Sequence, residues 1–352
     1  MKLRNMVRGV IDCVVHAEVG SVEQLVPHLP PHWQAVVSET GFRGPYVATQ
    51  PAGAPTMCAP RFLRADGAIE GTAPDHLARV LDRWSADVGI LCCDYAVDGI
   101  RNPDAAAALA AAVNDWLVET WLPADERFRA SLVLPIAQPE AAAAEIDRLG
   151  GHPRVVQALL PVRSAAPYGD RRYLPVFAAA DRAGIAVGLR AGGNPGNPPT
   201  GTGWPSYFAE EHAGMPAVFQ TQLLSLVAEG LFERFAGLRL ALLGSGFAWL
   251  PAFLWRLDKE WRGMRREIPW VRRAPSASIA DHVRIALQPI DVPATELGAV
   301  LDDLPAEDLL MFCTDHPRWQ FDADEDALPA AIPEPLRARI SGVIARDFYR
   351  LP

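Results

Sequence analysis

The feature that most constrains the fold is a regular succession of short apolar runs separated by longer amphipathic segments. The runs lack the alternation of polar and apolar residues that marks a sheet with one solvated face, so they predict strands buried on both faces. Strand, helix and strand in this order imply a parallel sheet with right-handed crossovers, and eight strands are the number that closes a (β/α)₈ barrel. The eight runs are residues 10–15, 88–93, 130–135, 155–160, 186–189, 239–243, 283–287 and 309–313.

The amphipathic segments predict the helices of the barrel, and no linker divides the chain, so we expect a single TIM-barrel domain over residues 1–352. Long loops are expected after the first and fifth strands, from about Pro30 to Pro74 and from Arg190 to Pro216. The second contains the Gly- and Pro-rich stretch 192–201, which forms either a lid over the catalytic face or a plain solvent loop. The predicted helices are 104–121, 139–149, 173–183, 217–235, 249–261 and 335–347.

Charge and composition exclude several classes of partner. The net charge of -9 disfavours nonspecific binding to nucleic acid, which depends on concentrated positive charge. The longest hydrophobic stretch, residues 247–255, contains Pro251, so we expect no membrane span. Five cysteines without CxxC spacing argue against a disulfide framework and a zinc ribbon, and favour a cytoplasmic protein.

Acidic and histidine side chains follow the first and last predicted strands. The first strand runs into His16, and the last is followed by Asp315 and His316. The carboxyl ends of barrel strands surround one mouth, where such folds place their chemistry. We therefore expect these groups to face each other across the mouth and to serve as acid and base.

Four segments carry a resemblance to a known family: residues 10–16, Asn114-Asp115-Trp116, residues 240–258 and residues 312–322. They resemble the amidohydrolase-related branch of the amidohydrolase superfamily, which includes nonoxidative decarboxylases such as aminocarboxymuconate semialdehyde decarboxylase. The resemblance implies hydrolysis, nonoxidative decarboxylation or related acid-base chemistry on a small carboxylated or cyclic substrate.

The resemblance also implies one divalent metal, held by a pair of residues after the first strand, histidines after the fifth and often the sixth, and an aspartate after the eighth. His16 and Asp315 match this set, whereas Val14, Arg190 and Gly244 stand where the other ligands are expected. Valine and glycine offer no side-chain donor, and arginine stays protonated. We therefore expect no tightly bound metal; if one binds, we expect a single Zn or Mn ion.

Arg190 is expected to supply a fixed positive charge where relatives hold the ion, and to pair with Asp315. The alternative is that Arg190 only reaches solvent from its strand end. His316 is either a base or a surface capping group. His212 either swings over the mouth or is a solvated residue at a helix end, and Asp12 is expected to have a packing role.

Two functions from different classes remain. The first is an enzyme in which Arg190 binds the substrate's anionic group while Asp315, His16 or His316 moves protons. The alternative is a catalytically silent protein that binds ligands or partners an intact homologue. Trp249, Trp255, Trp261 and Trp270 form either a subunit interface or ordinary packing, so we expect a homodimer or a heteromer with a homologue.

Overall fold

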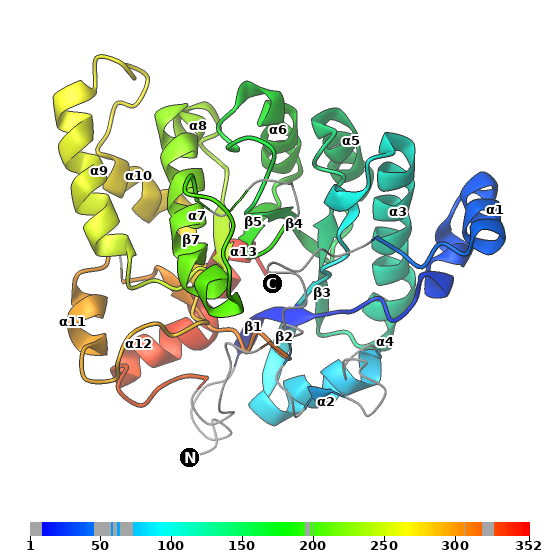
Figure 1. The fold of residues 1–352 in the computed structure, drawn as a ribbon. Coiled ribbons are helices and arrows are strands. Elements are labelled where there is room, and N and C mark those ends of the chain that lie inside the picture. Colours follow the sequence, from blue (N-terminus) through cyan, green and yellow to red (C-terminus); the bar gives the residue numbers. More distant parts are fainter. Residues whose placement is uncertain are drawn as a thin grey trace.

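The computed structural model describes residues 9–45, 58, 62–63, 73–193, 198, 200–305, 307–318 and 327–352. Eight parallel strands form one sheet in the order of the sequence, and the helices lie outside it (Figure 1). The prediction of a (β/α)₈ barrel is confirmed. The strands are β1 Val10–His16, β2 Ala86–Cys92, β3 Phe128–Val133, β4 Val155–Pro161, β5 Ala186–Arg190, β6 Leu240–Leu243, β7 Val283–Ala286 and β8 Leu310–Met311.

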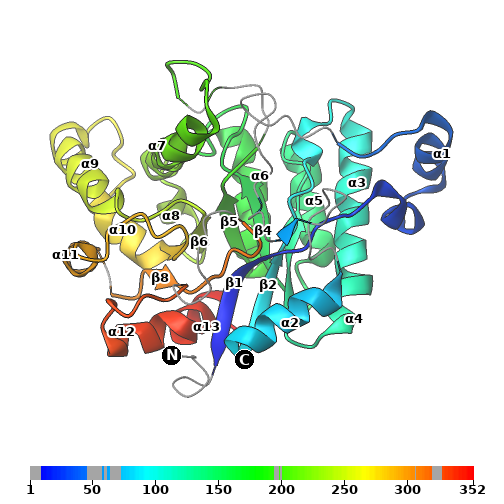
Figure 2. The same cartoon turned by 60° about the horizontal axis from the view of Figure 1, so that its bottom comes forward.

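The barrel closes between β8 and β1, the two ends of the sheet. The backbone N–H of Cys13 donates to Phe312, and that of His16 donates to His316, both at 3.0 Å. Asp12 adds a side-chain link, because it accepts from the backbone N–H of Thr314 at 3.0 Å and from its hydroxyl at 2.7 Å. Figure 2 shows β1 beside the last strand. The seam that Asp12 bridges therefore lies directly beneath the candidate site residues that follow both strands.

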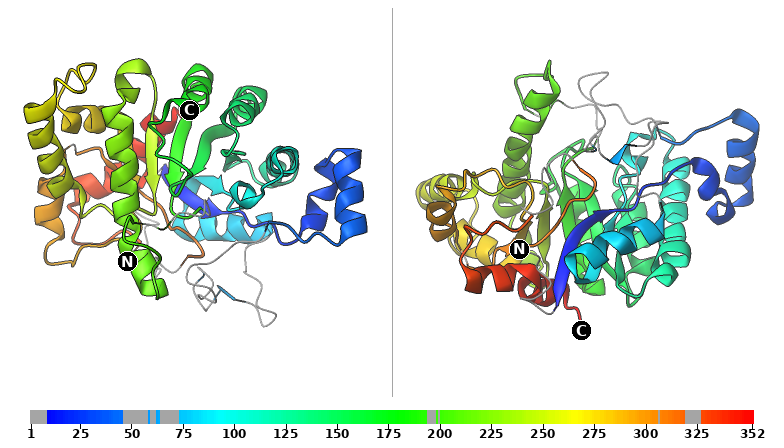
Figure 3. Two further views of the ribbon diagram at one scale, coloured as in Figure 1. Left: turned by 45° about the horizontal axis from the view of Figure 1, so that its top comes forward. Right: turned by 90° about the horizontal axis from the view of Figure 1, so that it is seen from below.

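The predicted helices are found with shifted ends, and they surround the strands (Figure 3). The largest shift concerns the helix expected at 217–235, which begins already at Phe208. The backbone N–H groups of Ser206 and Tyr207 donate to the Glu210 carboxylate at 2.6 and 2.8 Å, which caps that earlier start. The helices are α1 Pro31–Thr40, α2 Pro74–Trp84, α3 Pro103–Trp116, α4 Leu122–Ala124, α5 Pro139–Leu149, α6 Leu174–Ala183, α7 Phe208–Ala228, α8 Leu231–Arg234, α9 Leu250–Met264, α10 Pro275–His282, α11 Leu297–Asp302, α12 Glu334–Ala338 and α13 Ile344–Tyr349.

The two long connections are described only in part. After β1 the chain forms short 3-10 turns and α1, which stands apart from the barrel (Figure 1), and most of residues 46–72 lie outside the described residues. After β5, residues 194–197 and 199 of the predicted lid lie outside them too. The lid therefore stays a prediction.

Buried Asn114 connects the helical layer to the barrel. Its amide donates to the carbonyl of Val133 at 2.9 Å and accepts from the N–H of the same residue at 2.8 Å, which joins α3 to the end of β3. The amide also donates to Glu145 of α5 at 2.7 Å. One side chain from the segment that carried the family resemblance thus fixes two helices against a strand end.

The sequence argued against a disulfide framework and against a membrane span, and the structure bears on both predictions. All five cysteines are buried free thiols. Among the described helices, none combines the length and hydropathy that crossing a bilayer requires.

Candidate functional site

A cavity of about 550 Å³ opens at the carboxyl ends of the strands, on the face predicted for chemistry. This volume suits a small substituted ring. Its walls combine apolar side chains with charged groups from opposite sides of the mouth. The side chains of the wall include Val97, Val133, Leu134, Leu159, Phe208 and Met215 among the apolar groups, and Glu18, Asp94, Arg163, Arg190, Glu211, His212 and Arg318 among the polar ones.

The base of this cavity is a group of charged side chains that we term the ionic cluster. Each member ends a strand or follows one by a few residues, so the cluster is built by the barrel's own geometry. Three carboxylates face two guanidinium groups and one imidazole in it. Its members are His16 and Glu18 from β1, Asp94 after β2, Arg190 at the end of β5, and Asp315 and Arg318 after β8.

Arg318 occupies the centre of the cluster and is almost completely buried. Its Nη2 donates to Glu18 Oε1 at 2.9 Å and to Asp94 Oδ2, and it lies 3.3 Å from Nδ1 of His16. Burial by itself would lower the pKa of Arg318, but the charges of Asp94, Glu18 and Asp315 outweigh it and raise the pKa above its ordinary value. The guanidinium is therefore a permanent positive charge.

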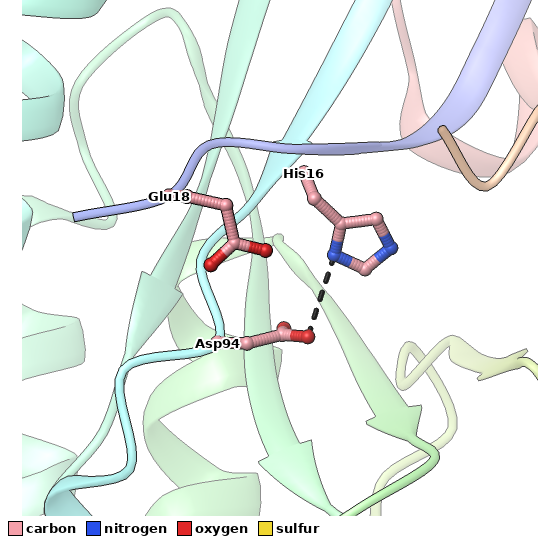
Figure 4. A group of neighbouring side chains, drawn as sticks. All are labelled: His16, Glu18 and Asp94. Carbon is pink, nitrogen blue, oxygen red and sulfur yellow. Dashed lines mark ion pairs between the residues drawn. The ribbon is translucent and has the colours of Figure 1, made fainter. Parts of the chain in front are cut away.

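His16 lies between two carboxylates. Its Nε2 is 2.8 Å from Asp315 Oδ1, and its Nδ1 is 3.4 Å from Asp94 Oδ2, the pair that Figure 4 marks. Burial and the charge of Arg318 act to lower the pKa of His16, but the charge of Asp94 and the bonds to both carboxylates raise it above 6.5 overall. A protonated ring donates to both acids and balances the three carboxylates of the cluster against three cations.

The structure corrects the expected partner of Arg190. We predicted a pair with Asp315, but Arg190 Nη1 pairs with Asp94 Oδ2 at 2.5 Å, while Asp315 bonds to His16. Burial alone would raise the pKa of Asp94, but the charges of Arg190, Arg318 and His16 hold it well below its usual range. Asp94 is therefore ionised and is the carboxylate that both arginines share.

The histidines expected at the mouth have different surroundings. His316 is buried and packs edge-on against the ring of Phe62 at 4.5 Å, and it does not line the cavity. His212 lies in the second turn of α7 and does line the cavity, so its description as a solvated residue at a helix end is wrong. Burial lowers the pKa of His212 against the opposing charge of Asp315.

Sequence reasoning missed three members of the cluster: Glu18, Asp94 and Arg318. Glu18 lies two residues beyond His16, Arg318 lies three beyond Asp315, and Asp94 directly follows the predicted strand 88–93. A search for every polar side chain within a few residues of a strand's carboxyl end would have found them. His16 and Asp315 are brought together as predicted.

Three side chains of the ionic cluster form a donor set of the kind that binds a divalent metal. His16, Glu18 and Asp94 offer one donor atom each, all within 4.8 Å of one another, and imidazole with two carboxylates is chemistry that suits zinc or manganese (Figure 4). However, Arg318 Nη2 contacts the donor atoms of all three. An ion about 2.0–2.2 Å from the same atoms would have to occupy the position of that nitrogen. The donor set itself therefore suits a single ion, and in this structure the guanidinium of Arg318 occupies the space between the donor atoms.

The wall of the cavity holds a second charged pair. Arg163, which follows β4, bonds through Nη1 to Glu211 Oε1 of α7 at 3.0 Å, and both side chains are more than nine-tenths buried. Arg163 follows β4 and Arg318 follows β8, and these two strands are opposite each other in an eight-stranded barrel.

Comparison with known sequences decides the family. The profile of the family described as Amidohydrolase matches residues 11–351, nearly the whole chain. The chain belongs to this family. The resemblance inferred from the strand-end motifs is thereby confirmed, although the profile match says nothing of a degraded metal site.

The relatives with described activities are decarboxylases. A gamma-resorcylate decarboxylase of Rhodococcus jostii is 31% identical over 208 residues, which is 52% of this chain and 59% of that protein. A gamma-resorcylate decarboxylase from a Polaromonas species is 29% identical over 205 residues, with the same coverage of each chain. The matches thus span about 59% of the length of these curated relatives.

Solved structures share the fold. An amidohydrolase of Mycobacterium avium superposes with a TM-score of 0.74 at 18% identity, over 98% of this chain and 99% of that one. A dihydroxybenzoic acid decarboxylase from a Polaromonas species, solved with manganese and the inhibitor 2-nitroresorcinol, gives 0.69 at 21% identity, over 98% and 97%. A 5-carboxyvanillate decarboxylase of Novosphingobium aromaticivorans, also complexed with manganese, gives 0.72 at 18% identity, over 99% and 97%.

Proposed function

We propose that this protein is a carbon-carbon lyase that removes carbon dioxide, without oxidation, from a small aromatic carboxylate. The observation that carries the proposal is the cavity itself, where two guanidinium groups and an ionised carboxylate adjoin apolar walls. The decarboxylases among its relatives support the reaction class.

Binding begins with the substrate's carboxylate at Arg190 and Arg318, both of which line the cavity. Guanidinium groups bind carboxylates in a planar, often bidentate geometry. The ring then lies against Val133, Leu134 and Leu159, where burial of apolar area adds affinity. This orientation places the carbon that bears the carboxylate next to Asp94.

The proton for this reaction comes from the chain Asp315, His16 and Asp94. Protonated His16 passes a proton to Asp94, whose Oδ1 carries no hydrogen bond among the described residues. A bound carboxylate competes for both guanidinium groups and adds negative charge beside Asp94, and both effects raise its low pKa. Asp94 then protonates the ring carbon, the bond to the carboxylate breaks, and CO₂ leaves while its electron pair restores the aromatic ring. Solvent reprotonates His16.

We further propose that no resident metal takes part. The charge that a divalent ion would supply to the substrate's carboxylate is already supplied by the two arginines. Arg318 lies between the three donors that an ion would need, and removing a buried guanidinium from its two carboxylate partners is costly.

The test uses purified full-length protein treated with a chelator, with metal content measured by mass spectrometry. Benzoate, the three monohydroxybenzoates, 2,6-dihydroxybenzoate and 5-carboxyvanillate are supplied, and CO₂ and the decarboxylated ring are quantified. We expect one CO₂ per ring product for at least one compound, and less than about a twofold change on adding manganese.

Two outcomes would contradict the proposal. Turnover that appears only with manganese or zinc would reject the metal-free site while keeping the reaction. Binding of these carboxylates without any release of CO₂ would favour the silent binding protein considered as the alternative.

The assembly is proposed on separate grounds. We propose one domain over residues 1–352 that forms a homodimer through the exposed side chains of Trp255 and Trp270. Trp249 and Trp261 are not part of this surface, because they pack against the core and donate to backbone carbonyls. Light scattering of the protein and of Trp255→Ala tests it: a wild type that runs as a monomer contradicts the dimer.

A further inference from the structure

Unpaired polar atoms are concentrated in the wall of the cavity. Of the buried side-chain atoms without a hydrogen-bond partner in the described part of the chain, most belong to residues that line this one space. A buried polar group without a partner is costly and calls for an explanation, such as a ligand or water. The atoms in the cavity wall are Asp94 Oδ1, Tyr95 OH, Arg163 Nε, Glu211 Oε2 and His212 Nε2.

Two of these atoms belong to a single ion pair. Arg163 and Glu211 use Nη1 and Oε1 for their mutual bond at 3.0 Å, which leaves the Nε–H donor of Arg163 and the Oε2 acceptor of Glu211 unused. A group that satisfies both must accept one hydrogen bond and donate another. A hydroxyl does both, whereas a carboxylate only accepts and would be repelled by Glu211.

We propose that the Arg163–Glu211 pair is a recognition site for a hydroxyl on the substrate's ring, at the end remote from the carboxylate. The inference rests on the proposed function, in which the carboxylate is held by Arg190 and Arg318, whose guanidinium groups meet at Asp94 after β2. Arg163 follows β4 and Arg318 follows β8, on the opposite strand of the barrel, so we infer a hydroxyl at the 3 or 4 position of the ring and not beside the carboxylate.

The environment of the pair strengthens such a contact. Both side chains are almost wholly buried, so their charges are weakly screened and a hydrogen bond to either is strong. Burial raises the pKa of Glu211, although the charge of Arg163 opposes the shift. A ring that lacks the hydroxyl leaves both atoms unsatisfied, and such sites discriminate strongly against the deoxygenated analogue.

The experiment measures binding by calorimetry, independently of turnover, with benzoate, the three monohydroxybenzoates and terephthalate as probes. In the wild type we expect 3- or 4-hydroxybenzoate to bind at least about tenfold more tightly than benzoate, and more tightly than 2-hydroxybenzoate and terephthalate. Glu211→Leu should bring this ratio close to one, and Glu211→Gln should keep part of it, because an amide oxygen still accepts. Benzoate itself should bind Glu211→Gln within about threefold of wild type, because its carboxylate is held elsewhere and the amide still accepts from Arg163.

Glu229→Gln is the matched control, because Glu229 forms an exposed pair with Arg171 near the other end of α7. It should leave all ratios unchanged. If the wild type binds 3- and 4-hydroxybenzoate no more tightly than benzoate, only water binds to the Arg163–Glu211 pair, and the inference is overturned. A ratio that survives Glu211→Leu, or an equal gain for the 2-hydroxy isomer, would place the hydroxyl elsewhere. Stronger binding of terephthalate would identify an anion site instead.

The binding experiment and the assay for CO₂ release test the hydroxyl site and the lyase reaction separately. A hydroxyl preference without CO₂ release would keep this site and reject the lyase. Release of CO₂ without the hydroxyl preference would keep the lyase and reject this site.

Discussion

Arg318 donates to Glu18 at 2.9 Å across the seam that joins the last strand to the first. The same nitrogen also bonds to Asp94, so one guanidinium connects the ends of β1, β2 and β8. In this fold those strand ends form one side of the mouth. A single residue after the last strand therefore organises a charged surface to which three strands contribute.

Removing this guanidinium should create a metal site. In Arg318→Ala, His16, Glu18 and Asp94 would lose the cation that they share, and their donor atoms already lie within 4.8 Å of one another. We expect the variant to bind one manganese or zinc ion at least about a hundredfold more tightly than wild type, measured by calorimetry. The variant should also be destabilised by about 3–5 kcal/mol, because the carboxylates are left unpaired.

Added metal should recover part of that loss, seen as a rise in melting temperature in Arg318→Ala alone. Arg182→Ala is the control, since Arg182 pairs with Asp147 on the surface. Stoichiometric metal in the wild type, or no gain in the variant, would show that Arg318 does not stand in for an ion.

Asp94→Asn should separate binding from chemistry. The amide keeps the shape but loses the charge shared by Arg190 and Arg318, so the two guanidinium groups attract the substrate's carboxylate more strongly. We expect KM to fall severalfold and kcat to fall by about a hundredfold, because the proton can no longer pass through residue 94. A variant with unchanged kcat would remove Asp94 from the proton path.

Arg190→Gln should mainly weaken substrate binding. Arg190 lines the cavity and is one of the two positive charges proposed to hold the carboxylate. Loss of a charge-assisted hydrogen bond predicts a rise in KM of about 10- to 100-fold. Steady-state kinetics beside Arg182→Gln checks this, and an unchanged KM would assign the carboxylate to Arg318 alone.

The fold could be predicted because its signals are local. Residues 155–160, for example, are apolar except for Gln157, and every residue of β4 except the last is buried. The site was only partly predictable. The barrel's closure brings His16 to Asp315, and that follows from strand order alone. Arg190 pairs with Asp94 because of the path that the chain takes after β2, and no local sequence pattern predicts that path.

The start of α7 was also not predicted from the sequence. We predicted a loop that ends at Pro216 and a helix that begins at residue 217. The carboxylate of Glu210 caps an earlier start, and the helix continues through Pro216. The early turns carry Glu211 and His212 into the cavity wall, so an error in a helix boundary concealed part of the site.

The last prediction concerns the seam beneath the site and the stability of the whole barrel. Burial raises the pKa of Asp12 from 3.8 to about 7, although its bonds to Thr314 and Val14 oppose the shift. A carboxyl whose pKa is higher in the folded protein binds its proton more tightly there than in the unfolded chain. Between about pH 4 and pH 7 this residue therefore lowers the free energy of unfolding as pH rises, by up to about 1.4 kcal/mol per pH unit.

Asp12→Asn removes this titration while keeping an oxygen that accepts from the backbone N–H of Thr314. Relative to wild type, the variant should gain stability progressively from pH 4 to pH 7 and show no further gain above about pH 8. Chemical denaturation at several pH values measures the difference, with Glu229→Gln as an exposed control. A difference that does not change with pH would mean that Asp12 stays ionised in the seam, held by the hydroxyl and N–H donors of Thr314.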